Sequence, residues 1–244
     1  MTTITLGHPY DDALGAALRY IRERYEPRGI LVTGTIVRGV PHPASDLDIV
    51  VVNPHPWRQR TQRVFETVPA EIFVNPRFEL EREFRRNADE GRPVMLHMIA
   101  TGIILDDPDG SLADLQRVAR EMLAAGPTCS RQHLTILAYG IATGFEDAVD
   151  IAAIDPNRAA ALVSEALVST ARLLFLRQGR WRPREKDLFR ELDALDPELG
   201  DAVRAALRAP SIEERIALAT PVIERAAGAT GFFEWETAPQ PLEP

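Results

Sequence analysis

Two aspartates, Asp46 and Asp48, stand one residue apart at the head of a run of β-branched residues, Ile49 to Val52. Such a run predicts a buried strand, and side chains two residues apart on a strand point to the same side of it. Two carboxylates on one side of a buried strand repel each other and are costly to desolvate, unless a cation lies between them. A divalent ion with oxygen ligands meets this need, and such an ion would serve phosphate chemistry.

A small turn precedes the aspartates and could complete a phosphate site. Gly34 and Thr35 follow a predicted strand over residues 30–33. Backbone amides at such a turn, together with a small hydroxyl, can approach phosphate oxygens closely. Arg38 follows and could bind a phosphate, and Ser45 directly precedes the aspartates. A Gly-Thr turn alone has little specificity, but the Ser-Asp-Leu-Asp segment eleven residues later makes the combination specific.

This segment resembles the active-site signature of the DNA polymerase beta-type nucleotidyltransferases. That signature reads Gly-Ser, then a short loop with Arg-Gly, then Ser-Asp-x-Asp. The resemblance extends over about residues 30–75, and Thr35 replaces the usual serine while keeping its hydroxyl. It implies transfer of a nucleoside monophosphate from ATP or another NTP, with pyrophosphate leaving and with two Mg²⁺ ions as cofactor. The matching residues are Gly34, Arg38, Gly39, Ser45, Asp46 and Asp48.

A third carboxylate is expected near the aspartate pair. The aspartates can hold metal ions about 3.5 to 4 Å apart, and a third acidic group serves as a further metal ligand or as the base that accepts the proton of the acceptor hydroxyl. Glu71 is the candidate, because it lies near the start of a predicted strand over residues 70–75. The alternatives are an exposed glutamate with no catalytic role and Glu66, a poorer candidate on a predicted helix.

Lys186 is the single lysine among 28 lysine and arginine residues. A compact ammonium suits a triphosphate tail, and a guanidinium does not replace it everywhere. In related two-domain enzymes that modify aminoglycosides, a lysine of the helical domain reaches the nucleotide phosphates. The Trp-x-x-x-x-Lys segment that ends at Lys186 looks similar. The resemblance therefore implies a nucleotide-binding role, and a residual surface lysine is the alternative.

Other residues that could do chemistry have ordinary explanations beside the functional ones. Glu146, Asp147 and Asp150 cluster on a predicted helix, with Glu146 and Asp150 on one face. They could line a site for a polycationic acceptor or form a solvated acidic surface. His97, in an apolar segment, is more typical of a hydrogen-bonded core histidine, and no spacing of histidine and cysteine indicates zinc.

The hydrophobic pattern predicts an α+β fold in which a catalytic half precedes an all-helical half. Residues 1–110 are predicted to form a nucleotidyltransferase domain with a small mixed sheet flanked by helices. Residues 111–235 are predicted to form a helical substrate-binding bundle, and residues 236–244, with three prolines, a flexible tail. In the first half we expect helices at residues 11–24, 57–67 and 77–90, and strands at 30–33, 46–52, 70–75, 94–100 and 103–105.

The composition disfavours some classes of partner. The chain has 244 residues, of which 45% are hydrophobic and 26% charged, as is typical of a globular protein. A net charge of −8 without a basic run disfavours nucleic acid, and no apolar run approaches the roughly 18 to 20 residues of a membrane span. Cys129 is the only cysteine, so an intrachain disulfide is excluded and a cytoplasmic setting is favoured.

Three functions follow as hypotheses. The first is an adenylyltransferase that modifies a hydroxyl of an aminoglycoside-like, cationic small molecule, with antibiotic resistance as its role. The second is an antitoxin-type nucleotidyltransferase that modifies or binds a protein. The third is a non-catalytic nucleotide-binding regulator, and the intact pair Asp46 and Asp48 speaks against it. A homodimer is compatible with these readings by analogy with the family alone.

Overall fold

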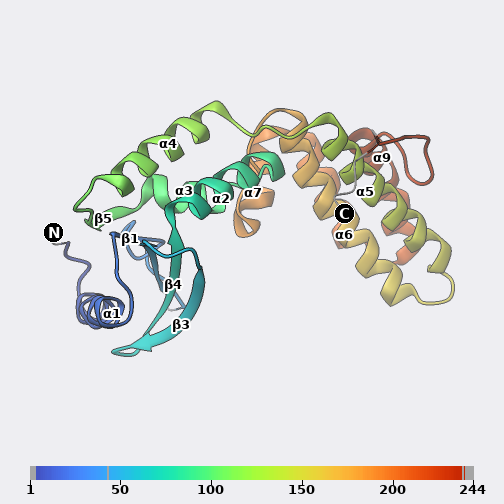
Figure 1. Ribbon diagram of the computed structural model, residues 1–244. Helices are drawn as coiled ribbons and strands as arrows, with labels where there is room; N and C mark the ends of the chain where they lie inside the picture. Colours follow the sequence, from blue (N-terminus) through green and yellow to red (C-terminus); the bar gives the residue numbers. More distant parts are fainter. Residues whose placement is uncertain (1–3, 43, 238, 240–244) are drawn as a thin grey trace. The chain divides into compact units, whose positions relative to one another are not determined.

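The computed structural model describes residues 4–42, 44–237 and 239 (Figure 1). By proximity of their Cα atoms, the residues divide into two compact units. The first unit comprises Met1–Ala88 and Pro93–Gly126, and the second comprises Asp89–Arg92 and Pro127–Pro244. Each unit has its own hydrophobic core. This organisation confirms the predicted α+β fold class. Residues 238 and 240–244 of the expected tail lie outside the described residues.

The first unit is built on a mixed sheet. Among the described residues it has five strands in the order β3-β4-β2-β1-β5. β2 and β4 run parallel, and the other neighbouring pairs are antiparallel. Every residue of β1 is buried, and β2 is buried except at the half-buried Asp48. The strands are β1 (Gly29–Thr33), β2 (Leu47–Asn53), β3 (Gln59–Phe65), β4 (Val68–Pro76) and β5 (Ile103–Asp106).

Helices with one apolar face cover this sheet. α1 (Tyr10–Arg24) buries Leu14 and Ile21 in a core that also contains Ile30 of β1 and Ile49 of β2. Residues next to these in the strands point to the opposite face. On that face Leu31 of β1 closely approaches Gly102, and two further helices, α3 (Val94–Thr101) and α4 (Ser111–Ala125), pack against β1 (Figure 1).

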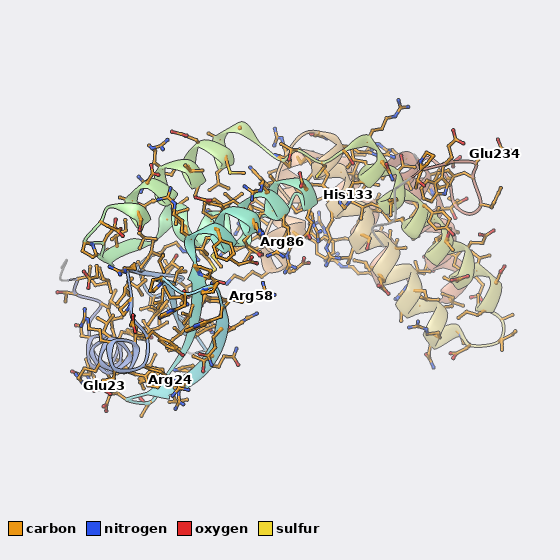
Figure 2. The ribbon with its side chains drawn as sticks, in the orientation of Figure 1. Glu23, Arg24, Arg58, Arg86, His133 and Glu234 are labelled. Atoms are coloured by element: carbon orange, nitrogen blue, oxygen red, sulfur yellow. The ribbon has the colours of Figure 1, made fainter. Side chains whose placement is uncertain are left out.

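The charged helix expected at residues 77–90 is α2 (Arg77–Glu90). Its surface carries ion pairs: Arg58 and Arg86, both labelled in Figure 2, lie 3.2 and 2.9 Å from a carboxylate oxygen of Glu79. Pairs of this exposed kind contribute little to stability. The buried side chains Leu80 and Phe84 on the other face hold the helix in place.

The predicted helix at residues 57–67 is wrong, because the segment forms the edge strand β3. β3 pairs antiparallel with β4 through a tight hairpin, in which Phe65 faces Val68. The two turn residues, Glu66 and Thr67, have positive φ angles of 45° and 75°. Two-residue hairpin turns of this hand favour Asn-Gly or Asp-Gly, and Glu-Thr lacks that signal. The mostly exposed side chains of β3 also hide the apolar alternation by which strands are recognised.

The strand predicted at residues 94–100 is also wrong, since these residues form the helix α3. A short apolar run does not separate a strand from a buried helix by periodicity. Here the side chain of the buried Asn87 decides the matter. Its Oδ1 accepts hydrogen bonds from the amides of Met95 (2.8 Å) and Leu96 (3.2 Å), two of the donors that a helix start leaves unpaired.

The boundary between the units lies after Gly126 and not at residue 110, where we expected it. α4 belongs to the first unit because its apolar face, with Leu112 and Leu115, is buried there. Gln116 adds a polar tie: its side-chain nitrogen donates to the carbonyl oxygens of Ile99 and Gly102, each at 2.9 Å. The turn signal before α4 therefore separates two elements of one unit.

The second unit is the predicted helical bundle. Four of its helices begin at an acidic or hydroxyl side chain that accepts a backbone hydrogen bond, as N-cap residues do: Ser130, Asp155, Asp196 and Ser211. α6 contributes more residues to the buried core than any other helix, and α5 and α9 pack against it. The helices are α5 (Arg131–Ile151), α6 (Pro156–Arg177), α7 (Leu188–Leu195), α8 (Pro197–Arg208) and α9 (Ile212–Ala227), with a short 3-10 helix, η1 (Glu185–Asp187).

α6 differs from the expectation that no segment is apolar enough to cross a membrane. Among the described residues, it is the one helix that is long and apolar enough to cross a membrane, by length and composition only. Half of its most apolar stretch is buried inside the unit. Val163, Leu167 and Leu173 of this helix lie in the hydrophobic core of the bundle, so the apolar character of α6 is explained by its place in the bundle.

We predict that Asn87→Ala lowers the free energy of unfolding by about 1–3 kcal/mol, because it leaves buried amides of α3 without a partner. Urea unfolding measures the free energy, and native-state hydrogen exchange at the amides of Met95 and Leu96 measures the local effect. Asn157→Ala, at an exposed position of α6, is the matched control and should change stability little. Equal stability of the two variants would contradict the capping role of Asn87.

Candidate active site

Three carboxylates meet on β2 and β4 and form the acidic triad: Asp46, Asp48 and Glu71. Their ligand oxygens all lie within 4.8 Å of one another. Asp48 and Glu71 are direct neighbours in the parallel pairing of β2 with β4, and Asp46 precedes β2 by one residue. Glu71 is buried, and the two aspartates are half-buried. The structure thus brings together the three acidic residues that the sequence singled out.

The turn that begins at Gly34 contacts this triad directly. Gly34 follows β1 and has φ +95°, a backbone conformation that favours glycine. A Cβ atom at Gly34 would lie 2.5 Å from Oδ2 of Asp48. Both facts require glycine here. With glycine at position 34, the backbone of the turn can lie closer to the carboxylate of Asp48 than it could with any other residue there.

Hydroxyl groups hold the two ends of the loop between Gly34 and Asp46 together. The Oγ1 atom of Thr35 and the Oγ atom of the buried Ser45 are 2.9 Å apart. Ser45 Oγ also accepts a hydrogen bond from the amide of His42 at 2.8 Å. Thr35 thus makes this contact with its hydroxyl group, which the serine usual at this position would also provide. Arg38 is exposed on the same loop, and its charge acts on Asp48 as described below.

Burial and like charge raise the pKa of Asp48 to about 7. Desolvation is the largest cause, followed by the negative charges of Asp46 and Glu71, whereas the positive charges of Arg38 and Arg60 act in the opposite direction. A carboxyl group in this state favours a cation beside it. Three close, hard oxygen donors fit a divalent ion such as Mg²⁺, so the donor set of the acidic triad suits the metal that the sequence implies.

Two residues that the sequence analysis missed lie on β3 and hold Glu71. The guanidinium Nε of Arg60 and the side-chain nitrogen of Gln62 both donate to Oε1 of Glu71, the latter at 3.1 Å. Because residues 57–67 were predicted to be a helix, nothing placed Arg60 and Gln62 beside Glu71. Their spacing of two residues on a strand was the signal that could have found them. Contacts of this kind orient a carboxylate, as a metal ligand requires.

A hollow of about 320 Å³ opens beside the acidic triad. Carboxylates of Asp46 and Glu71 line it, together with Gln62 and Arg63 from β3 and Ala70 from β4. Since all of these residues belong to the first unit, this unit offers space for a ligand next to its acidic residues. The neighbouring β3–β4 hairpin forms part of the wall.

The remaining candidates lie elsewhere. Lys186 belongs to the second unit, where it is exposed on η1, and its contact with a nucleotide stays a prediction. Glu66 lies in the hairpin turn and not in the acidic triad. Glu146, the first of the three acidic residues on α5, is half-buried in the second unit. His97 lies on α3 rather than on a strand.

We predict that the pH dependence of stability reveals Asp48. The folded metal-free protein holds a proton on Asp48 up to pH of about 7, whereas the unfolded chain releases it near 3.8. The folded state therefore binds more protons between these values, and its stability falls as pH rises through that window. Thermal unfolding in EDTA should show this decline, and Asp48→Asn should flatten it.

Mg²⁺ should reverse the trend, because the ion binds the deprotonated carboxylate. Calorimetric titration with Mg²⁺ is therefore expected to give a tighter apparent Kd as pH rises to about 7, and little further change above it. Parallel stability curves for the wild type and Asp48→Asn across this range would show that the proton is held elsewhere.

We predict that Arg60→Gln weakens Mg²⁺ binding by about 10- to 100-fold, as is usual when a partner that orients a metal ligand is lost. The hydrogen bond to Glu71 from Nε is the contact removed. Arg58→Gln, which affects only the surface pair with Glu79, is the control. Unchanged binding by Arg60→Gln would mean that Glu71 keeps its position without this contact.

Comparison with known proteins agrees with this geometry. Residues 15–96 match the family model described as the nucleotidyltransferase domain. Among solved structures, a nucleotidyltransferase-like protein from Exiguobacterium sibiricum 255-15 is similar with a TM-score of 0.58 and 19% sequence identity; the match spans 88% of this chain and 74% of that chain. At this identity the likeness shows a shared fold. No curated protein matches the chain.

The matched range contains the turn at Gly34, the acidic triad and the strands that carry them. The signature that the sequence resembled, the positions of its carboxylates and the family match therefore agree. Residues 15–96 therefore carry a nucleotidyltransferase domain, in agreement with the resemblance to the DNA polymerase beta type.

Proposed function

We propose that this protein transfers AMP from ATP onto a hydroxyl group of a small molecule in a Mg²⁺-dependent reaction. The observation that carries the proposal is the acidic triad, whose ligand oxygens lie within 4.8 Å of one another beside an open hollow. A non-catalytic nucleotide binder would not need to hold three mutually repelling carboxylates in this way. In the reaction, a bond forms between the acceptor oxygen and the α-phosphorus, the bond from that phosphorus to the leaving pyrophosphate breaks, and the proton of the hydroxyl is released to water.

The acidic triad would hold the Mg²⁺ ions. When bound, such ions neutralise the triphosphate and stabilise the attacking and leaving oxygens. Asp48 supplies a carboxylate from β2, and Asp46 supplies one from the position directly before this strand. Glu71 serves as a metal ligand in this proposal, because hydrogen bonds from Arg60 and Gln62 hold its carboxylate in a fixed orientation.

The loop after β1 would hold the nucleotide phosphates. The backbone at Gly34 can approach a phosphate closely because no side chain projects from it. Thr35 and Ser45 present hydroxyl groups that already bind each other, and the exposed Arg38 supplies a positive charge. From the second unit, Lys186 would contribute an ammonium group to the triphosphate.

The acceptor is the least specified part of the proposal. The resemblance to two-domain aminoglycoside-modifying enzymes suggests an aminoglycoside-like polycation and a role in antibiotic resistance. On α5, Glu146 and Asp150 are carboxylates that could bind such a molecule. We place the reaction in the cytoplasm, where NTP and Mg²⁺ are available and where a lone cysteine such as Cys129 stays reduced.

We predict that Asp48→Asn lowers nucleotidyl transfer by at least about 100-fold, since even partners outside a metal's own ligands are worth 10- to 100-fold. The measurement is transfer of label from α-labelled ATP with Mg²⁺ to aminoglycosides, other hydroxylated small molecules and candidate proteins. Asp201→Asn removes only a surface ion pair with Arg204 and is the control.

Label on a small molecule would support the proposal. Label on a protein would replace it with a protein-modifying, antitoxin-type function. Full transfer by Asp48→Asn would show that the acidic triad is not the metal site.

A further inference from the structure

A second hollow, of about 400 Å³, lies within the helical unit between α5 and α6. Pockets that hold small molecules have volumes of this order. Buried side chains of the bundle core, Ile141 and Leu173 among them, form part of its lining. Ile136, with 43% of its surface exposed, and Leu162 add apolar surface. The hollow is therefore an apolar space with access from solvent.

Two glycines on α5, Gly140 and Gly144, line this hollow one helical turn apart. A Cβ atom at either position would meet no atom of the described residues within 4 Å. Glycine disfavours a helix relative to alanine, and the packing of the bundle does not require it at these two places. The exposed helix backbone is thus available for close approach by another molecule.

Two arginines, Arg172 and Arg182, also line the hollow. The Nε atom of each is buried and has no hydrogen-bond partner among the described residues. Arg172 donates through its terminal nitrogen to Glu185, and Arg182 lies 3.8 Å from the same carboxylate. A buried donor without a partner is unfavourable, so each arginine has a donor left for a ligand atom with a lone pair.

The charge balance of the lining disfavours cations. The charged groups of the lining are Arg172, Arg182 and the exposed Glu165, and Glu185, which pairs with both arginines, lies outside the lining. Burial and the neighbouring positive charge of Arg172 lower the pKa of Arg182. A positively charged ligand in the hollow would add to the repulsion between the guanidinium groups of Arg172 and Arg182, whereas an oxyanion or a neutral acceptor atom would relieve this repulsion.

We propose that the hollow between α5 and α6 is a binding site for a small, largely apolar molecule that is uncharged or carries an oxyanion. The glycine-lined wall accepts the apolar body, and the free donors of Arg172 and Arg182 bind an oxygen of the ligand. The inference stands apart from the proposed function, because every residue that lines this hollow belongs to the second unit.

The test uses two fluorescent probes that differ by one sulfonate group, 8-anilinonaphthalene-1-sulfonate and the neutral N-phenyl-1-naphthylamine, titrated into the full chain. Both should bind, the sulfonate more tightly, and neomycin, a polycation, should displace neither. Gly144→Leu fills the hollow and should weaken both probes by at least about 10-fold. Arg182→Gln should weaken the sulfonate by about 10-fold and leave the neutral probe unchanged.

Control variants distinguish binding at this site from non-specific binding of the probes. Gly15→Leu introduces the same side chain on α1, where a Cβ would meet only the far end of Arg19, and Arg208→Gln removes an arginine that does not line the hollow. Both should bind the probes like the wild type. If Gly144→Leu does not fold, Gly144→Ala is the second variant, and it should keep the fold while weakening both probes by a smaller factor.

Several outcomes would overturn the proposal. Wild-type probe binding by both Gly144 variants would show that the probes bind elsewhere, and displacement of both probes by Mg-ATP would assign the hollow to the nucleotide. An oligomer that Gly144→Leu converts to monomer in light scattering would make it an interface between copies of this chain. Probe binding without any nucleotidyl transfer would count against the proposed function and leave this site in place.

Discussion

The repulsion among three carboxylates is the constraint on which the first unit depends. Asp48 and Glu71 face each other across paired strands, with Asp46 beside them. The burial that holds these strands together also removes the water that would otherwise screen the charges. Arg60 and Gln62 offset part of the repulsion at Glu71, and burial, together with the charges of Asp46 and Glu71, raises the pKa of Asp48. A bound divalent cation is the simplest way to remove the repulsion.

The hydrophobic core keeps the carboxylates together in spite of this repulsion. Ile49 and Val51 of β2, and Ile72 and Val74 of β4, are fully buried in the core that α1 covers. A slip of one residue between the strands would turn every side chain of one strand to the opposite face. Because such a slip would expose these apolar residues, the register that places Asp48 beside Glu71 is maintained by the burial of residues that have no part in the chemistry.

The sequence predicts those parts of the site whose residues share one local pattern. The aspartate pair and the turn at Gly34 lie within one short signature, and an acidic residue at the head of an apolar strand points to Glu71. Arg60 and Gln62 belong to no such pattern: they reach Glu71 only through the β3–β4 pairing. That pairing depends on a turn without the usual residues, at Glu66 and Thr67.

The same limit applies to the rest of the fold. The apolar run of α3 is a helix because Asn87, several residues upstream, binds its first amides. The unit boundary shifts because α4 buries its apolar face in the first unit. In both places the deciding contact joins elements that are separate in the sequence. The long helices α5 and α6 of the second unit, each capped by its own N-terminal residue, could be predicted from local signals alone.

The position of β3 at the edge of the sheet has a consequence for solubility. An edge strand offers unpaired backbone groups to other chains, and proteins protect such strands with charged side chains. Arg60 and Arg63 place two positive charges on β3, both in an exposed position. Arg60 therefore has two tasks, to hold Glu71 and to keep the outer strand from pairing with another molecule, so the requirements of the site and of colloidal stability select the same residue type there.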